Sequence, residues 1–371
     1  MSMNKKLNNA LDVIKEKVDM SLNKFTFTFP AAISKGYVYP PVEELGWTEG
    51  FRTGILWMLY ELTGEEKYKN SAEIQCEIFK IREERDINLN HHDIGFLYSL
   101  SSVAAYKITH EDKYKETALN AADKLCRRFR EKGGFLQAWG DMDKADNYRL
   151  IVDCLLNIPL LFWASEVSGN ERYEYIAKTH LKTAVKNIIR DDFTTYHTYF
   201  FDPQTGEPLR GATAQGYSDD SCWSRGQAWA MYGLAIAYSY TQDAELIPLF
   251  NGVTKYFIEH LPSNYVPYWD LIFTDGNEPR DTSAAAVAVC AILHMNKFVP
   301  NPEFMDAADK MLESLMDNYS TNAMSYCDGL LTDGMYSRKT VYSGNRECTT
   351  WGDYFYMEAV TRKLKDWEMY W

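Results

Sequence analysis

The chain has 371 residues, and 39 Lys and Arg against 52 Asp and Glu give a formal net charge of −13. This acidic balance, with no basic stripe, argues against nucleic-acid binding, because such ligands are held by cationic side chains that release counterions. The N-terminal segment has no uninterrupted apolar stretch, which argues against a signal peptide or membrane span and favours a cytoplasmic protein. The seven scattered cysteines include no CxxC pair, so we expect reduced, mostly buried thiols.

The predicted elements begin with an amphipathic helix from about residue 6 to 22. Five segments of one form follow, each ending an apolar helix, turning through polar residues and opening a second helix: 61–68, 107–114, 166–173, 239–246 and 297–304. The helices before these turns are apolar almost all round and are predicted to be inner helices: 54–62, 94–108, 153–167, 226–240 and 282–298. Helices after the turns, such as 113–132 and 303–319, are half polar and are predicted to form an outer layer.

A sixth apolar helix, 351–364, has almost no chain after it, and the N-terminal helix has no inner helix before it. We expect these two ends to pair and close a ring. Six inner and six outer helices make an all-α (α/α)6 barrel, which accounts for residues 1–371 as one domain. The long segments between hairpins then gather at one rim, where function is expected.

The rim segments concentrate Trp, His, Asp, Gly and Arg, and they span 37–50, 88–95, 131–153, 194–229 and 335–354. The whole chain is rich in aromatic residues, with 10 Trp, 26 Tyr and 18 Phe. Most large aromatic side chains belong to protein cores, but flat rings also line sugar-binding grooves. We therefore interpret the rim as a carbohydrate groove.

Two aspartates stand at the predicted entrances to inner helices, Asp93 and Asp153. Asp93 could simply cap a helix by accepting backbone N–H bonds. Asp153 has apolar neighbours, so its carboxyl should be desolvated and its pKa raised toward that of a general acid. Two carboxyl groups across a groove are the minimum for glycoside hydrolysis.

His92, His197 and Arg225 are further candidates in the same segments. Either histidine could be a buried structural residue, but both are well placed to bind sugar hydroxyls. Arg225 lies between Trp223 and Trp229; it could form an outward salt bridge, but its flanking tryptophans favour a fork that clamps a carboxylate. Motifs for serine hydrolases, P-loops, zincins and dinucleotide binding are missing, and we expect neither a metal nor a cofactor.

Five sequence blocks carry a resemblance to a known family: NHHDIGF (90–96), RLIVDCLLNIPLLFWAS (149–165), YHTYFFDPQTGEP (196–208), AQGYSDDSCWSRGQAWAMYG (214–233) and TTWGDYFYMEA (349–359). Together they resemble the unsaturated glucuronyl hydrolases, glycoside hydrolase family 88, over about residues 39–364. The resemblance implies an (α/α)6 barrel and a substrate made by polysaccharide lyases, with a 4-deoxy-4,5-unsaturated uronic acid at its non-reducing end. It also implies hydration of the C4=C5 double bond in place of attack at the anomeric carbon.

The resemblance assigns roles residue by residue. Asp153 matches the family's general acid and base, and Asp93 matches its second essential aspartate. Positions that match substrate contacts are His92, His197, Gln215, Trp223 and Arg225, and those that match aromatic positions of the cleft are Trp47, Trp139 and Trp229.

The sequence departs from the family pattern at two places. Ala214 stands where the family often has histidine, which removes a donor near the sugar. The last long loop lacks the lysine of the SxxSxK motif that accompanies sulfated substrates, because Asn345 follows Ser343 and Gly344. Arg346 or Lys339 are candidate replacements, so a preference for sulfated sugars is an open question.

The leading hypothesis is therefore an unsaturated glucuronyl hydrolase acting on a di- or oligosaccharide that carries an unsaturated uronic acid. Two enzyme alternatives keep the fold and both aspartates: an unsaturated rhamnogalacturonyl hydrolase and a conventional inverting glycosidase. A third alternative is a non-catalytic sugar-binding toroid in which the aspartates are helix caps.

Overall fold

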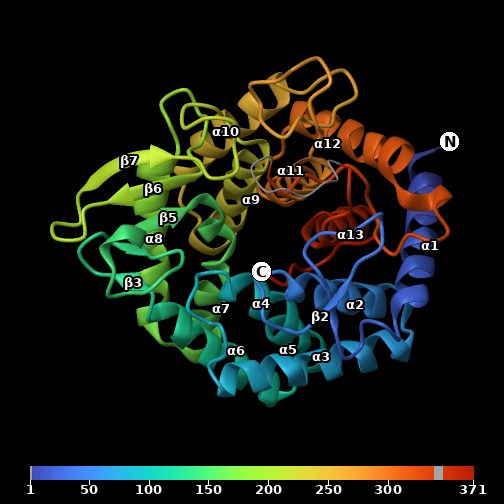
Figure 1. The fold of residues 1–371 in the computed structure, drawn as a ribbon, viewed down its shortest axis with the longest axis horizontal. Coiled ribbons are helices and arrows are strands. Elements are labelled where there is room, and N and C mark those ends of the chain that lie inside the picture. The colour runs from blue at the N-terminus through green and yellow to red at the C-terminus, as the bar shows by residue number, and fades with distance from the viewer. Residues whose placement is uncertain (1, 338–345) are drawn as a thin grey trace.

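The computed structural model describes residues 2–337 and 346–371, and its helices form two concentric rings (Figure 1). The inner ring holds α2 (Glu49–Thr63), α4 and α5 (Ile94–Tyr98 and Ala104–Thr109), α7 (Pro159–Ser168), α9 (Ser224–Thr241), α11 (Thr282–Met295) and α13 (Thr350–Leu364). The outer ring holds α1 (Met3–Ser21), α3 (Glu66–Glu84), α6 (Asp112–Cys126), α8 (Glu171–Ile188), α10 (Leu246–Glu259) and α12 (Pro302–Ser314). The predicted (α/α)6 barrel is confirmed.

The inner helices are buried on nearly every side because both rings and the barrel axis surround them. Almost all side chains of α9 and α11 are inaccessible to solvent. The alanine-rich sequence of α11 suits its place between α9 and α13, since small side chains allow a close approach and alanine favours the helix. A glycine in the left-handed region, Gly64 or Gly169, ends α2 and α7 at φ 70° and turns the chain into the outer helix.

The helical pattern differs from the expected one at several places. Residues Ser99–Val103 form a π-helical turn that joins α4 to α5. The helix expected from residue 153 is split: Val152–Leu156 is a 3₁₀ turn, and α7 begins at Pro159, where a missing N–H costs nothing. The outer helix expected over 113–132 ends at Cys126, because the next residues enter a strand.

Short antiparallel strands occupy the segments between hairpins. β1 (Phe29–Pro30) pairs with β2 (Pro41–Val42), and β3 (Phe129–Arg130) pairs with β4 (Phe135–Leu136). β5 (Arg149–Ile151), β6 (Thr198–Phe201) and β7 (Pro208–Ala212) form a three-stranded sheet that extends away from the ring centre (Figure 1). Hydrophobic periodicity did not reveal these strands, because most are too short to show an alternating pattern.

The chain termini meet the last inner helix. α1 packs against α13, and the tail after α13 runs to the centre of the ring (Figure 1). There the Trp371 ring stacks on Phe355, with centroids 5.8 Å apart, and its Nε1 donates to Glu358 Oε2 at 3.0 Å. The tail therefore fills the barrel axis with aromatic side chains.

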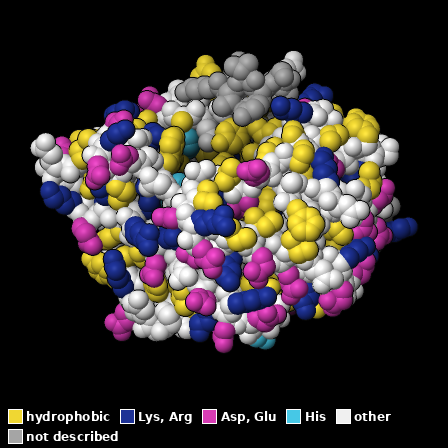
Figure 2. All heavy atoms as spheres, turned by 60° about the horizontal axis from the view of Figure 1, so that its bottom comes forward, with side chains coloured by type: hydrophobic (Ala, Val, Ile, Leu, Met, Phe, Trp, Pro, Cys, Tyr) yellow, Lys and Arg dark blue, Asp and Glu magenta, His cyan; other side chains and the backbone are white. Residues whose placement is uncertain are grey.

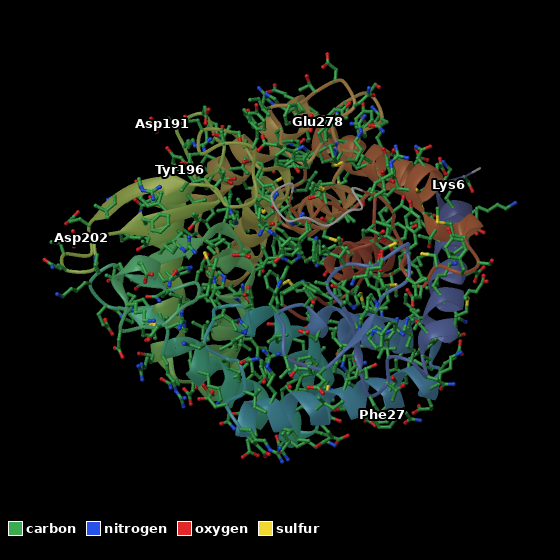
Figure 3. The ribbon with its side chains drawn as sticks, viewed as in Figure 1. Lys6, Phe27, Asp191, Tyr196, Asp202 and Glu278 are labelled. Atoms are coloured by element: carbon green, nitrogen blue, oxygen red, sulfur yellow. The ribbon has the colours of Figure 1, made fainter. Side chains whose placement is uncertain are left out.

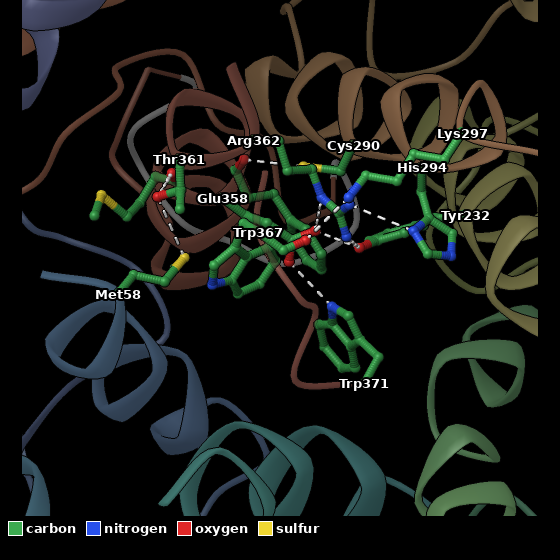
Figure 4. A network of polar contacts seen from close by, with 12 residues as sticks. Met58, Tyr232, Cys290, His294, Lys297, Glu358, Thr361, Arg362, Trp367 and Trp371 are labelled. Carbon is green, nitrogen blue, oxygen red and sulfur yellow. Dashed lines mark hydrogen bonds and ion pairs between the residues drawn. The ribbon is translucent and has the colours of Figure 1, made fainter. Parts of the chain in front are cut away.

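A buried polar network links α13 to α9 beside this tail (Figure 4). Arg362 Nε donates to Glu358 Oε1 at 2.9 Å, and its Nη2 donates to the Tyr232 hydroxyl at 2.7 Å. Because breaking a buried pair leaves an uncompensated charge, this network holds the two helices in one arrangement. Within the described residues, no helix has the length and apolarity needed to cross a membrane.

Candidate active site

A cleft of about 400 Å³ opens at the rim where the inter-hairpin segments gather. Figure 2 shows hydrophobic side chains around a hollow in this face. Ten of the residues that the sequence analysis selected line the cleft: Trp47, His92, Asp93, Trp139, Asp153, His197, Gln215, Trp223, Arg225 and Trp229. Ile151, Ala214, Tyr336 and Ser337 complete the lining.

A glycine contact brings the two aspartates together. A Cβ on Gly95 would lie 2.3 Å from the Asn157 Cα, so only glycine allows the first turn of α4 to touch the turn after Asp153. Asn157 Oδ1 also accepts a hydrogen bond from the Phe96 N–H at 2.9 Å. Asp93 stands at the N-cap position of α4, but its side chain makes no capping hydrogen bond. The helix-cap alternative therefore finds no support at Asp93.

His92 lies between the carboxyl groups. Its Nε2 is 3.4 Å from Oδ1 of Asp93 and 3.4 Å from Oδ1 of Asp153. The backbone N–H of His92 donates to the Ala138 carbonyl at 2.7 Å, which ties this residue to the strand segment opposite. His91 supports Asp93 from the other side, with Nδ1 3.4 Å from Asp93 Oδ2.

The two aspartates have opposite pKa shifts. Burial and the nearby charge of Asp93 raise the pKa of Asp153 well above its ordinary value, and Asp153 Oδ1 is buried without a hydrogen-bond partner among the described residues. Burial also opposes ionisation of Asp93, but His92, His91 and Asn157 outweigh it, so the pKa of Asp93 lies below its ordinary value. Burial lowers the pKa of His92 to about 4, which leaves its imidazole neutral near pH 7. The cleft therefore pairs a carboxyl group whose environment favours the protonated form with one whose environment favours the ionised form.

The tryptophans of the cleft differ in what they offer a ligand. Trp139 is 42% exposed, whereas Trp223 and Trp229 are almost completely buried. Trp47 stacks on Trp351 with ring centroids 5.3 Å apart, and Trp223 packs edge to face on the His197 ring. Trp139 thus presents an open face for a sugar ring, while Trp223 and Trp229 form the wall behind the site.

His197 is oriented by the segment that carries Gln215. Its Nδ1 accepts the backbone N–H of Ala214 at 2.8 Å. A neutral imidazole that accepts at Nδ1 carries its proton on Nε2, so His197 is a hydrogen-bond donor through that atom. Ala214, where a histidine was expected, therefore contributes to the site through its backbone.

Arg225 has partners that the sequence did not predict. Its Nη1 donates to Asp281 and to the Met335 carbonyl, and its Nη2 donates to Gln215 Oε1 at 2.8 Å and to the Tyr336 carbonyl at 2.7 Å. The guanidinium is 2% exposed, and Asp281 is completely buried. The salt bridge of Arg225 points inward to Asp281, so it is neither the outward pair that was the alternative nor the expected clamp on a substrate carboxylate. Both terminal nitrogens already donate to protein oxygens. This geometry favours a positioning role over a direct clamp on a substrate carboxylate.

Comparison with known proteins decides the family. A family model described as Glycosyl Hydrolase Family 88 matches residues 21–365. The chain belongs to this family.

Relatives and solved structures agree with this assignment. The family 88 chain is 44% identical to an unsaturated chondroitin disaccharide hydrolase of Streptococcus pneumoniae, over 98% of this chain and 93% of the relative. It is 38% identical to an unsaturated glucuronyl hydrolase of Bacillus sp., over 95% of each chain. A crystal structure of unsaturated glucuronyl hydrolase from Streptococcus agalactiae superposes with a TM-score of 0.97 at 44% identity, covering 100% of this chain and 95% of that one.

Three residues predicted to bind substrate, Ser343, Asn345 and Arg346, belong to the last long loop. Ser343 and Asn345 lie outside the described residues. Arg346 is 79% exposed, with Nε 3.5 Å from Asp333, and it lines a separate polar pocket beside Arg280 and Asn318. The structure thus places Arg346 away from the aspartates of this family 88 cleft.

Sequence reasoning missed four residues that support the site: His91, Asn157, Asp281 and Tyr336. Asp281 carried one readable signal, because an aspartate before Thr-Ser at the start of a helix predicts a cap, and its Oδ1 does accept the Ser283 N–H at 3.1 Å. Its second oxygen binds Arg225, which lies 56 residues away along the chain. No local pattern could have shown that pairing.

His92, Asp93 and Asp153 also have the donor types and spacing of a possible cation site, with ligand atoms within 4.8 Å of one another. A carboxyl group that holds its proton is a poor metal ligand, because metal ligands must be deprotonated. The raised pKa of Asp153 suits general-acid chemistry in this family 88 site.

Proposed function

We propose that the protein hydrates the C4=C5 double bond of a 4-deoxy-4,5-unsaturated uronic acid at the non-reducing end of glycosaminoglycan-type oligosaccharides, and so releases that sugar. The observation that carries the proposal is the meeting of two carboxyl groups in one aromatic cleft, Asp153 with its pKa raised by burial and Asp93 with its pKa lowered. Relatives named for the hydrolysis of unsaturated chondroitin disaccharide support the substrate class. A similar structure, at TM-score 0.88 and 41% identity, is a complex with dGlcA-GalNAc6S.

The first step is a proton transfer. Asp153 gives its proton to C4, and the electron pair of the C4=C5 bond forms the new C4–H bond. The resulting positive charge at C5 is shared with the ring oxygen, and the carboxylate of Asp93 stabilises it electrostatically. A desolvated carboxyl with a raised pKa is suited to this step, because it still holds its proton near neutral pH.

The second step adds water. The Asp153 carboxylate takes a proton from a water molecule whose oxygen bonds to C5, which restores the acid form of Asp153. The product is a hemiketal at C5. Its ring opens to a C5 ketone, and the hemiacetal formed at C1 expels the next sugar. One water molecule is consumed, and no cofactor enters the sequence.

Turnover of an unsaturated chondroitin disaccharide in ¹⁸O-labelled water tests the proposal. Hydration removes the ultraviolet absorbance of the conjugated double bond and places the label on C5. A conventional inverting glycosidase would place the label on C1 and keep the absorbance, and a sugar-binding toroid would leave the substrate intact. Either of these results contradicts the proposal.

We also propose that the enzyme acts in the bacterial cytoplasm. All seven cysteines are free and buried, and the sulfur atoms of Cys327 and Cys348 lie 3.8 Å apart in a thiol hydrogen bond, without a disulfide. Two thiols this close avoid oxidation to a disulfide most easily in a reducing compartment. Cell fractionation with a cytoplasmic marker enzyme tests this location, and recovery with the secreted fraction would contradict it.

A further inference from the structure

Two arginines lie on one face of the sheet β5–β6–β7, with a phenylalanine between them. The strand register places Arg149 opposite Phe200, and Phe200 opposite Arg210. Arg149 Cζ lies 4.3 Å from the Trp139 ring and 5.1 Å from the Phe200 ring, and Arg210 Cζ lies 4.6 Å from the Phe200 ring. We call this row of Trp139, Arg149, Phe200 and Arg210 the arginine ladder.

The arginine ladder continues the floor of the cleft. Trp139 and Ile151 both line the cleft. Side chains alternate along a strand, so Arg149 points to the same face as Ile151, at roughly 7 Å farther along β5. The opposite face carries Leu150, which is completely buried in the core. The ladder therefore lies on the outer face of the sheet, toward the hairpin end where Asp202 is labelled (Figure 3).

The guanidinium groups of the ladder have no polar partner among the described residues. Within the described residues, neither Arg149 nor Arg210 makes a hydrogen bond or an ion pair, and the Arg149 Nε is buried and unsatisfied. By contrast, Arg82, Arg225 and Arg362 are buried and bind carboxylates. Asp146 acts on Arg149 only from a distance, as a favourable charge without an ion pair.

We propose that the arginine ladder is a subsite for an anionic group, a sulfate ester or a uronate carboxylate, on a sugar beyond the ring that is released. This inference rests on the proposed function for the position of the first ring. Stacking on Trp139 and Phe200 restrains both guanidinium groups, so their N–H donors are already oriented for a two-oxygen contact. The exposed part of the Trp139 ring offers apolar surface to the carbon side of a sugar. The ladder thus supplies cationic groups to an acidic protein at one edge of its cleft.

The test compares substrates that differ in anionic groups beyond the first ring. The unsulfated unsaturated chondroitin disaccharide has none, the unsulfated tetrasaccharide adds an internal uronate, and the sulfated tetrasaccharide adds sulfate esters. The Arg210→Gln variant should lower the ratio of kcat/KM for tetrasaccharide to kcat/KM for disaccharide by about fivefold. This is the effect expected from the loss of one exposed ion pair whose free energy lies near the upper end of the usual range. The double variant Arg149→Gln/Arg210→Gln should lower it further. A loss confined to the sulfated tetrasaccharide identifies sulfate as the group bound, and a loss with both tetrasaccharides identifies the uronate.

Arg172→Gln is the matched control. Arg172 is exposed in the first turn of α8, just after the turn that joins α7 to α8. This variant changes the net charge by the same amount as Arg210→Gln and should leave the tetrasaccharide-to-disaccharide ratio of kcat/KM unchanged. High salt should abolish the difference between wild type and Arg210→Gln, since a Debye length of about 3 Å at 1 M screens exposed charges. Equal ratios in wild type and both ladder variants would overturn the proposal, as would an equal loss in Arg172→Gln.

Calorimetric binding of a saturated chondroitin sulfate tetrasaccharide, which has no double bond to hydrate, separates this proposal from the proposed function. Weaker binding by the ladder variants supports the ladder even if wild type hydrates nothing. Unchanged binding together with normal turnover by wild type rejects the ladder and leaves the proposed function standing.

Discussion

Asp93 and Asp153 share one imidazole, because Nε2 of His92 lies 3.4 Å from Oδ1 of each carboxyl group. A neutral imidazole carries at most one proton on this nitrogen and can donate it to only one of the two. The ionised Asp93 is the stronger acceptor, so the N–H of His92 does not stabilise a negative charge on Asp153. One histidine thereby helps two neighbouring carboxyl groups to hold different protonation states.

Replacing Asp153 by asparagine should keep the fold and lower kcat by about 10²- to 10⁴-fold, the usual contribution of a general acid and base. The loss of ultraviolet absorbance measures the rate, and calorimetry checks that substrate still binds. Normal turnover in a folded variant would remove Asp153 from the mechanism.

The same variant should unfold at a higher temperature near pH 7. The pKa of Asp153 is raised on folding, so the wild-type protein loses stability as pH rises above the ordinary carboxyl value of 3.8. Asparagine removes this loss because it has no proton to give up. The difference in Tm between variant and wild type should shrink as pH falls toward 3.8. A lower Tm for Asp153→Asn at pH 7 would contradict the assigned shift.

The pH profile of kcat/KM should be bell-shaped. Activity requires an ionised Asp93 and falls at acid pH below its lowered pKa; it requires a protonated Asp153 and falls as pH rises through its raised pKa. The Asp93→Asn variant should be severely impaired, and the alkaline limb of its residual activity should move to lower pH. The reason is that the negative charge of Asp93 helps to raise the pKa of Asp153. An unmoved alkaline limb would mean that another group titrates there.

Arg225→Ala should destabilise the protein by about 3 to 5 kcal/mol, because Asp281 is then left buried and unpaired. Urea unfolding measures the free energy, with the exposed Arg172→Ala as a control expected to change it by less than about 0.5 kcal/mol. Since both terminal nitrogens already bind protein oxygens, kcat/KM should fall equally for the uronic acid and for its methyl ester. A much larger loss for the acid would restore Arg225 as a direct clamp on the carboxylate.

Gly95→Ala should reduce both stability and kcat, because its Cβ would meet the Asn157 backbone at 2.3 Å and push the segment of Asp93 away from that of Asp153. Gly54→Ala is the matched control: its Cβ would meet the Tyr354 ring at 2.5 Å, but Gly54 does not line the cleft. Both variants should lower Tm, and only Gly95→Ala should lower kcat in the folded protein. Equal kcat values would show that the spacing of the aspartates tolerates this shift.

Turnover should be unaffected by a chelator, because no step of the proposed mechanism uses a metal at His92, Asp93 and Asp153. Activity measured before and after EDTA treatment and gel filtration checks this. A loss of activity that a divalent cation restores would instead assign His92, Asp93 and Asp153 to a metal site.

The sequence by itself determined the barrel and most of the residues of its cleft. The inner helices are apolar almost all round, and the outer helices are apolar on one face. Because the turns between them repeat one pattern, local periodicity assigns each helix to the inner or the outer ring. The rim followed from the connectivity of the hairpins. Aspartate and tryptophan in those rim segments, with the family resemblance, then predicted ten residues that line the cleft.

Only the tertiary structure decided how these residues act on one another. Three contacts join segments that are far apart in the chain: His92 with both aspartates, Gly95 with Asn157, and Arg225 with Asp281. The arginine ladder likewise depends on a strand register that hydrophobic periodicity did not reveal. Periodicity reports which face of an element is buried, whereas a pKa or a hydrogen-bond partner depends on atoms that meet only when the ring closes.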